Sequence, residues 1–103
     1  MEMRFDLGTI VMTTGIQALI ASSKLAHESP GFDEELAGLL RRHAAGDWGD
    51  ICEDDKEYND ENVKAGCPDV LSSYITSNGE VWIKTDVYSP LEHITTILLP
   101  EEY

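Results

Sequence analysis

Residues 70–87 read Val-Leu-Ser-Ser-Tyr-Ile-Thr-Ser-Asn-Gly-Glu-Val-Trp-Ile-Lys-Thr-Asp-Val, and they carry the clearest secondary-structure signal of the chain. Asn78-Gly79 stands between two runs that are rich in β-branched and aromatic residues. An Asn-Gly pair in that setting is the strongest short-range signal for a β-hairpin. We therefore expect antiparallel strands over residues 70–77 and 80–87.

The second of these strands has two different faces. Alternation places Val81, Ile83, Thr85 and Val87 on one face, because successive side chains of a strand point in opposite directions. Trp82 falls on the other face. We expect Trp82 either to lie under a helix or to contact a partner.

Working outward, the chain predicts further strands at 7–13 and 94–99 and helices at 14–28, 33–45 and 53–64. The middle helix has acids in its first turn and bases in its last, which suits the helix dipole, and Gly46 is its natural C′ residue. The order of strand, helices, hairpin and strand predicts one α+β domain over residues 1–103. We expect a small antiparallel sheet of about three to four strands, with helices packed on one face.

The net charge limits the function most. Twenty Asp and Glu residues against seven Lys and Arg leave a formal net charge of −13 at pH 7. Such a surface repels nucleic acid and anionic lipid and attracts basic proteins. We therefore expect no direct binding to nucleic acid or membrane, and a basic nucleic-acid-binding protein or complex as the partner.

Several features predict a cytoplasmic protein. The N-terminal residues lack the layout of a signal peptide, and the longest apolar runs are too short to span a membrane. Cys52 and Cys67 match neither a disulfide framework nor a zinc motif, which favours free thiols in a reducing compartment.

An acidic run from residue 47 to residue 61 contains Lys56 as its single base. Its carboxylates are the candidate partner-binding residues: Asp47, Asp50, Glu53, Asp54, Asp55, Glu57, Asp60 and Glu61. Three interpretations are open, namely a cation site, a solvated face or a surface for a basic partner. The run does not match the spacing of an EF-hand loop, so we expect no metal and no cofactor.

The residues around the end of the middle helix carry a second hypothesis. His43 and Asp47 could meet across the helix C-terminus, which would make His43 a general base oriented by Asp47 or Asp50. The structural alternative makes His43 a capping group and Trp48 a plug under the helix. No nucleophile is evident from the spacing, so we favour the structural alternative and expect no catalytic residues.

Three segments together resemble a family of small uncharacterised bacterial proteins carried on plasmids, prophages and other mobile elements. They are residues 42–50 (RHAAGDWGD), residues 53–56 (EDDK) with Asn59, and residues 95–103 (TTILLPEEY). The resemblance implies a common fold and a mobile-element setting, and it brings no established activity. With that setting, the expected compartment is the cytoplasm of a bacterium, or of the host cell of a phage or plasmid. Residues 82–94 depart from the family pattern, because they are longer and lack an arginine found there.

Charge, size and setting together predict a non-enzymatic inhibitor. Small acidic proteins of mobile elements include several that block restriction enzymes or CRISPR complexes by imitating DNA, and this is an analogy rather than a derivation. We therefore expect an anti-CRISPR or anti-restriction DNA mimic. The alternatives are an accessory or antitoxin-like protein that binds a basic cognate partner, or a small enzyme that uses His43 and Asp47.

Overall fold

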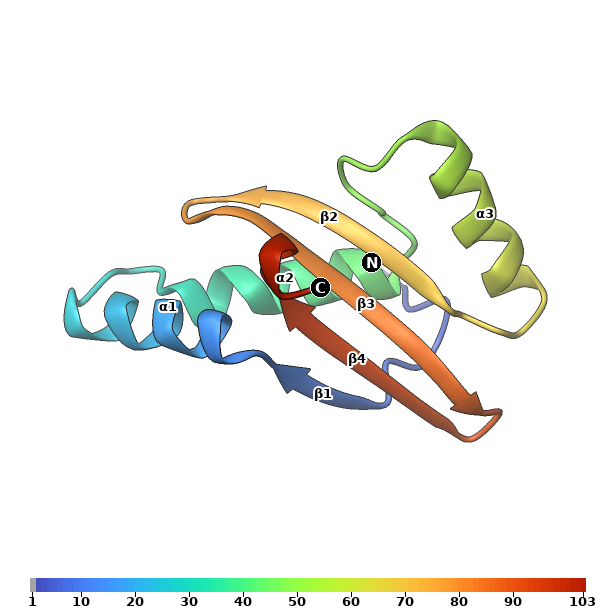
Figure 1. Ribbon diagram of the computed structural model, residues 1–103, viewed down its shortest axis with the longest axis horizontal. Coiled ribbons are helices and arrows are strands. Elements are labelled where there is room, and N and C mark those ends of the chain that lie inside the picture. The colour runs from blue at the N-terminus through green and yellow to red at the C-terminus, as the bar shows by residue number, and fades with distance from the viewer. Residues whose placement is uncertain (1) are drawn as a thin grey trace.

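The computed structural model describes residues 2–103 and has the expected α+β architecture. Three α-helices and a short 3-10 helix accompany a four-stranded sheet (Figure 1). The elements in chain order are β1 (Thr9–Met12), α1 (Thr14–Leu25), α2 (Phe32–Ala44), α3 (Glu53–Lys64), β2 (Val70–Thr76), β3 (Gly79–Ser89), β4 (Glu92–Leu98) and η1 (Pro100–Glu102). Within residues 2–103, none of the helices has the length and apolar character needed to cross a membrane.

The sheet is mixed, with the strand order β1-β4-β3-β2. Its β2/β3 and β3/β4 pairs are antiparallel, whereas β1 runs parallel to β4. The expectation of an antiparallel sheet therefore holds for β2, β3 and β4, and the parallel pairing of β1 departs from it. Side chains alternate in either direction of pairing, and β1 reaches β4 through most of the chain rather than through a hairpin, so a parallel crossover is allowed.

The predicted hairpin joins β2 to β3, but its turn differs in detail from the Asn-Gly signal. Thr76 pairs with Gly79, so Ser77 and Asn78 are the two central residues. Gly79 follows them with a φ of 93°. A glycine with left-handed backbone after the turn is typical of a hairpin that carries a bulge.

One face of the sheet packs on α1 and α2, as Figure 1 shows. The hydrophobic core there consists of Ile16, Phe32, Leu36, Leu39, Tyr74, Val81, Ile83 and Ile97. Full burial of one such side chain stabilises the fold by about 1.5–3 kcal/mol. The third helix, α3, contributes nothing to this cluster and lies beside β2 at the edge of the sheet (Figure 1).

Trp82 lies on the opposite face of the sheet from α1 and α2. Its ring meets the ring of Tyr103 edge-to-face, with centroids 5.3 Å apart, and its Nε1–H donates to Glu80 over 2.8 Å. Tyr103 directly follows η1, so the end of the chain folds back onto β3. Trp82 therefore packs against Tyr103, the residue that follows η1, and not under one of the three α-helices. Contact of Trp82 with a partner stays a prediction.

Candidate functional site

The acidic run begins at the turn that closes α2. Gly46 has a φ of 84°, and the N–H groups of Gly46 and Asp47 donate to the carbonyls of His43 and Arg42 over 3.1 and 2.9 Å. These two hydrogen bonds form a Schellman motif. Gly46 is therefore the C′ residue, as the sequence predicts.

The chain then runs along the outer edge of β2. The N–H of Ser73 donates to the carbonyl of Trp48 over 3.3 Å, and the N–H of Asp50 donates to the carbonyl of Ser73 over 2.7 Å. Gly49 allows this approach, because a Cβ on it would lie 1.9 Å from the Ser73 oxygen. The first part of the acidic run thus pairs with an edge strand.

The same edge is covered further along by α3. The side-chain amide of Asn59 donates to the carbonyl of Leu71, and that of Asn62 donates to the carbonyl of Asp69, both over 2.9 Å. An uncovered edge invites unwanted pairing with other chains. The inner side of α3 therefore has a structural role that depends on two amides.

Trp48 contacts both α2 and α3, and it is 3% exposed. Its ring stacks near Phe5 at 6.1 Å and meets His43 edge-to-face at 5.6 Å. Its Nε1–H donates to Asp60 of α3 over 2.9 Å. The prediction that Trp48 is a buried plug is confirmed.

Two of the eight candidate carboxylates are held by side chains outside α3. Asp47 accepts a hydrogen bond from Arg42 Nε over 2.7 Å, and this bond lowers the pKa of Asp47. Asp60 accepts the Trp48 indole and lies 3.5 Å from Arg4. Both acids therefore support the fold.

The other six candidates are exposed, namely Asp50, Glu53, Asp54, Asp55, Glu57 and Glu61. A helix advances about 100° per residue, so with Asn59 facing β2, four of these acids point away from the sheet. We call these four the outer acidic face: Glu53, Asp54, Glu57 and Glu61. One ion pair, Lys56 to Glu53 at 3.5 Å, reaches this face, and an exposed pair of this kind contributes about 0–1 kcal/mol.

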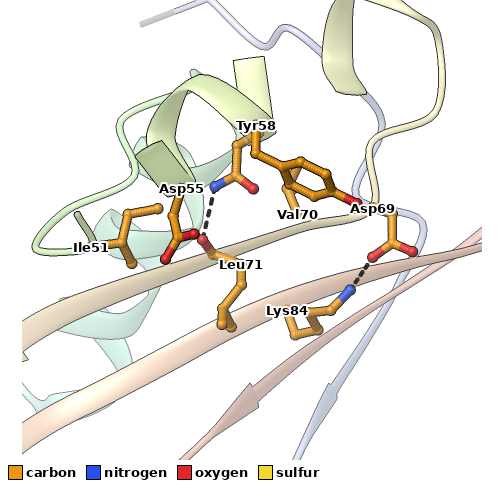
Figure 2. A pocket seen from close by; sticks show the side chains of 8 residues that line it. Ile51, Asp55, Tyr58, Asp69, Val70, Leu71 and Lys84 are labelled. Atoms are coloured by element: carbon orange, nitrogen blue, oxygen red, sulfur yellow. Dashed lines mark hydrogen bonds and ion pairs between the residues drawn. The ribbon is translucent and has the colours of Figure 1, made fainter. Parts of the chain in front are cut away.

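A groove of about 210 Å³ lies between α3 and the sheet (Figure 2). Ile51, Val70 and Leu71 give it apolar walls. Asp55 of α3 and Asp69 at the start of β2 contribute carboxylates, and the ring of Tyr58 lies above Asp69 in Figure 2. The groove therefore combines apolar, aromatic and anionic surface. We call it the α3 groove.

Lys84 of β3 lies at the base of the α3 groove. Its Nζ donates to Asp69, to Asp86 over 3.0 Å and to the carbonyl of Thr85 over 2.9 Å. Burial disfavours the charged amine, but the hydrogen bonds to Asp69 and Asp86 outweigh burial and raise the pKa of Lys84. The lysine is thus fully paired, and Asp55 stays available to a ligand.

Sequence reasoning missed Asp69 and Lys84 as parts of a site. They are fifteen positions apart, and the pairing of Leu71 with Lys84 across the hairpin brings them together. One signal was present, because Lys84 is the single Lys or Arg after Lys64. An isolated base in an acidic chain is expected to have a carboxylate partner.

The structure does not bring His43 and Asp47 together as a catalytic pair. His43 is 0% exposed, and its ring nitrogens contact Ser72 Oγ at 2.5 Å and Thr85 Oγ1 at 2.9 Å. The expectation that His43 caps α2 is also wrong, because the Schellman motif closes the helix and the imidazole points to the sheet. Asp47 pairs with Arg42 instead.

His43 belongs to a buried polar chain that crosses the sheet. Burial, and then the nearby charge of Lys84, lower the pKa of His43 to about 3, so the ring is neutral. Thr95 Oγ1 donates to the carbonyl of Leu7 over 2.7 Å, so it must accept from Thr85 Oγ1, which lies 2.7 Å away. The Thr85 proton is then used, and His43 must donate to Thr85 through Nε2–H.

The hydrogen-bond role of the other ring nitrogen, Nδ1, follows from this assignment. Because the neutral ring carries one proton and that proton is on Nε2, Nδ1 accepts from the hydroxyl of Ser72. Every polar side-chain atom of this network has a hydrogen-bond partner. Ser72, His43, Thr85 and Thr95 are all completely buried. His43 is thus a structural residue with a defined tautomer.

The acidic residues do not gather around one point. Within residues 2–103, no three His, Cys, Asp or Glu side chains are placed to hold a metal ion. Cys52, at the N-cap of α3, and Cys67, after its end, are both free and exposed. The arrangement presents an extended anionic surface rather than a coordination site.

Comparison with family models, with curated proteins and with solved structures finds no match to this chain. The resemblance to proteins of mobile elements stays a prediction. The function must therefore be argued from the outer acidic face and the α3 groove.

Proposed function

We propose that this chain is a non-enzymatic binding protein whose α3 surface occupies the basic site of a nucleic-acid-binding protein. Its target would be a host defence complex, a restriction enzyme or a CRISPR effector, which it would inhibit by DNA mimicry. One observation carries the proposal: the outer acidic face carries four exposed carboxylates that take no part in holding α3 to the sheet.

The outer acidic face is costly for the helix that bears it. Glu57 has acidic neighbours three or four positions away on both sides, namely Glu53, Asp54, Asp60 and Glu61. Each like-charge pair at such a spacing destabilises a helix by about 0.2–0.5 kcal/mol. Covering the β2 edge requires only the inner side of α3, so this cost supports a role in binding.

The geometry of the row suits a basic partner. Glu53, Glu57 and Glu61 follow one another at four-residue intervals, which corresponds to about 6 Å of helix rise per step. One DNA strand presents a charge about every 3.4 Å along the axis. Asp54, on the same face of α3, raises the charge density of the row toward that value.

The α3 groove would supply the anchor of the interface. A lysine or arginine side chain has an apolar stem and a charged head. The stem would lie against Ile51 and Leu71, and the head would meet the carboxylate of Asp55 and the ring of Tyr58. Pockets of this kind at an interface centre commonly hold the residues that contribute most to binding.

The test is resistance to defence in living cells. The chain is expressed in bacterial strains that carry a defined restriction or CRISPR system, and plasmid transformation is counted. The test variant carries Asp54→Asn, Glu57→Gln and Glu61→Gln. The control variant carries Glu28→Gln, Glu92→Gln and Glu101→Gln, which remove the same number of charges at exposed positions outside α3.

We expect the wild type and the control to restore transformation in at least one strain, and the test variant to lose most of this effect. A pull-down of the target at low salt should weaken at high salt, because opposed charge rows are screened. Equal loss of protection in both variants would attribute the effect to net charge alone. Absence of protection in all strains, with no target recovered from lysate, would reject the proposal.

A further inference from the structure

The two edges of the sheet differ in how they are covered. The outer edge of β2 is satisfied by the backbone of residues 48–50 and by the amides of Asn59 and Asn62. At the other edge, no segment of residues 2–103 pairs with the outer side of β1. Figure 1 shows β1 as the outermost strand on the side away from α3.

The free hydrogen-bonding groups of β1 can be assigned. The N–H of Thr13 donates to the carbonyl of Ile97 in β4 over 3.1 Å. Because backbone groups alternate along a strand, the N–H and C=O of Val11 also face β4, and those of Ile10 and Met12 face outward. The Met12 carbonyl accepts from Gln17 Nε2 over 2.8 Å. The N–H and C=O of Ile10 and the N–H of Met12 are left for an added strand.

This edge also lacks the usual protection against pairing. All four residues of β1 are exposed, and Thr-Ile-Val-Met contains no charge and no proline. Natural edge strands commonly carry lysine, proline or a bulge to prevent pairing. The β2 edge of the same sheet is covered, so the bare edge of β1 is a local feature of this side.

An apolar groove lies directly beside β1. It has a volume of about 170 Å³ and is lined by Ile10, Met12, Ile20, Leu36, Leu40 and Ile97. Asp33, in the first turn of α2, is its charged member. A strand added to β1 would project alternate side chains next to Ile10 and Met12, over this groove.

We infer that β1 and this groove bind an extended segment of another protein by strand addition. In this mode the edge backbone supplies affinity, and a pocket for alternate side chains supplies specificity. The segment carries apolar side chains at alternate positions and lysine or arginine at its ends. This surface is separate from α3 and does not depend on the function proposed for it.

Charge decides the occupant. A second copy of this chain would bring a net charge of −13 against the same charge, whereas a basic segment is attracted. The exposed carboxylate of Asp33, which lines the groove, favours a cation at one end of the segment. The inference therefore commits to a basic, extended segment rather than to a homodimer.

The probe is a short peptide with isoleucine and valine at alternate positions, threonine between them and a lysine at each end. Amide hydrogen exchange of the labelled protein is recorded by NMR with and without the peptide. We expect exchange at Ile10 and Met12 to slow by about tenfold, the effect of one added hydrogen bond, while the amide of Val11 is unchanged. The same peptide with methylated backbone nitrogens should give no such protection.

Two variants examine the two halves of the site. Ile10→Pro removes an outward N–H that β4 does not use, and proline is tolerated at such edge positions. Ala37→Leu fills the groove from α2 and leaves the sequence and backbone N–H groups of β1 unchanged. Each should weaken peptide binding by about tenfold. The α3 test variant, Asp54→Asn with Glu57→Gln and Glu61→Gln, should bind the peptide like the wild type.

Other results would overturn the inference. Retained binding in Ile10→Pro and Ala37→Leu, or no protection at millimolar peptide, would reject strand addition at β1. Loss of binding in the α3 test variant would show that the peptide is held by the outer acidic face. Protection of Ile10 and Met12 in the free protein that rises with protein concentration would identify a second copy as the occupant.

Discussion

His43 is enclosed by groups that keep its ring neutral. Its two nitrogens contact hydroxyls, and the nearest charge that acts on it is the cation of Lys84. Protonation would put a second cation into a buried space that offers the ring no carboxylate. Both the burial and the lysine therefore act in the same direction on the pKa of His43.

This environment predicts how stability depends on pH. The unfolded chain binds a proton at His43 with a pKa of about 6.5, whereas the folded chain does so at about 3. Between these values the unfolded state holds more protons, so the free energy of unfolding falls as pH falls. From about pH 7 to pH 5 the wild type should lose about 2 kcal/mol more than His43→Gln.

Urea unfolding at both pH values measures this difference. The two proteins share all carboxylates, so the carboxylates contribute equally to both pH profiles. The difference between the profiles therefore reports on His43. NMR of the ring nitrogens should show the Nε2–H tautomer throughout the range. Parallel pH profiles of the two proteins, or a His43 ring that titrates near neutral pH, would contradict the buried neutral chain.

The direction of the polar chain predicts the effect of removing its middle member. Thr85→Val keeps the shape of the side chain but leaves His43 Nε2–H and Thr95 Oγ1 without their partner. A buried polar group without a partner costs about 1–3 kcal/mol. Thr96→Val, one position from Thr95 and on the other face of the sheet, is the matched control and should change the free energy of unfolding by about 0.5 kcal/mol or less.

At the scale of elements, local signals predicted most of the fold. The helix predicted over residues 53–64 is α3, Glu53–Lys64, and the hairpin predicted by Asn78-Gly79 joins β2 to β3. The direction of β1 was not predictable, because alternation is the same in parallel and antiparallel pairs. It depends on contacts between β1 and β4, which are far apart in the chain.

Only part of the candidate site was predicted, because the rest also depends on contacts between distant parts of the chain. The composition of the acidic run pointed to α3, and helical periodicity shows which of its acids share a face. The partners of Asp60 and the α3 groove were not predictable. They involve Trp48, Arg4 and Lys84, whose positions depend on packing and strand register rather than on neighbours in sequence.

The crowding of carboxylates on α3 predicts that removing one of them stabilises the protein. Glu57→Gln removes four like-charge pairs and keeps a similar helix propensity. The free energy of unfolding should therefore rise by about 1 kcal/mol at low salt. Glu28→Gln, exposed and outside α3, is the control and should have little effect.

Salt tests whether this gain is electrostatic. At about 1 M salt the screening length is about 3 Å, so the difference between Glu57→Gln and the wild type should nearly vanish. A gain that persists at high salt would indicate a change in packing. A loss of stability at low salt would contradict the view that the outer acidic face is costly for α3.

At the scale of the whole molecule, the two proposed surfaces lie at opposite edges of one sheet. The β2 edge carries α3 and its carboxylates, and the β1 edge carries an uncharged strand beside an apolar groove. A partner bound at one edge leaves the other edge free. The molecule could therefore hold a basic surface with α3 and an extended segment with β1 at the same time.

The high net charge predicts opposite effects of salt on folding and on binding. A charge of −13 on a small domain destabilises its compact state through self-repulsion, and added salt screens this repulsion. The urea midpoint should therefore rise between about 0.01 M and about 0.5 M sodium chloride. The affinity for a basic target should fall over the same range, because the attraction is screened in the same way.

The variant with Asp54→Asn, Glu57→Gln and Glu61→Gln connects these two effects to α3. It should be more stable than the wild type at low salt and gain less from added salt, since part of the repulsion is already removed. Glu28→Gln with Glu92→Gln and Glu101→Gln should keep a larger salt gain, because those acids are not crowded on one helix. Equal salt gains in both variants would mean that the repulsion comes from the total charge, and the outer acidic face would then have no special cost that a binding role must explain.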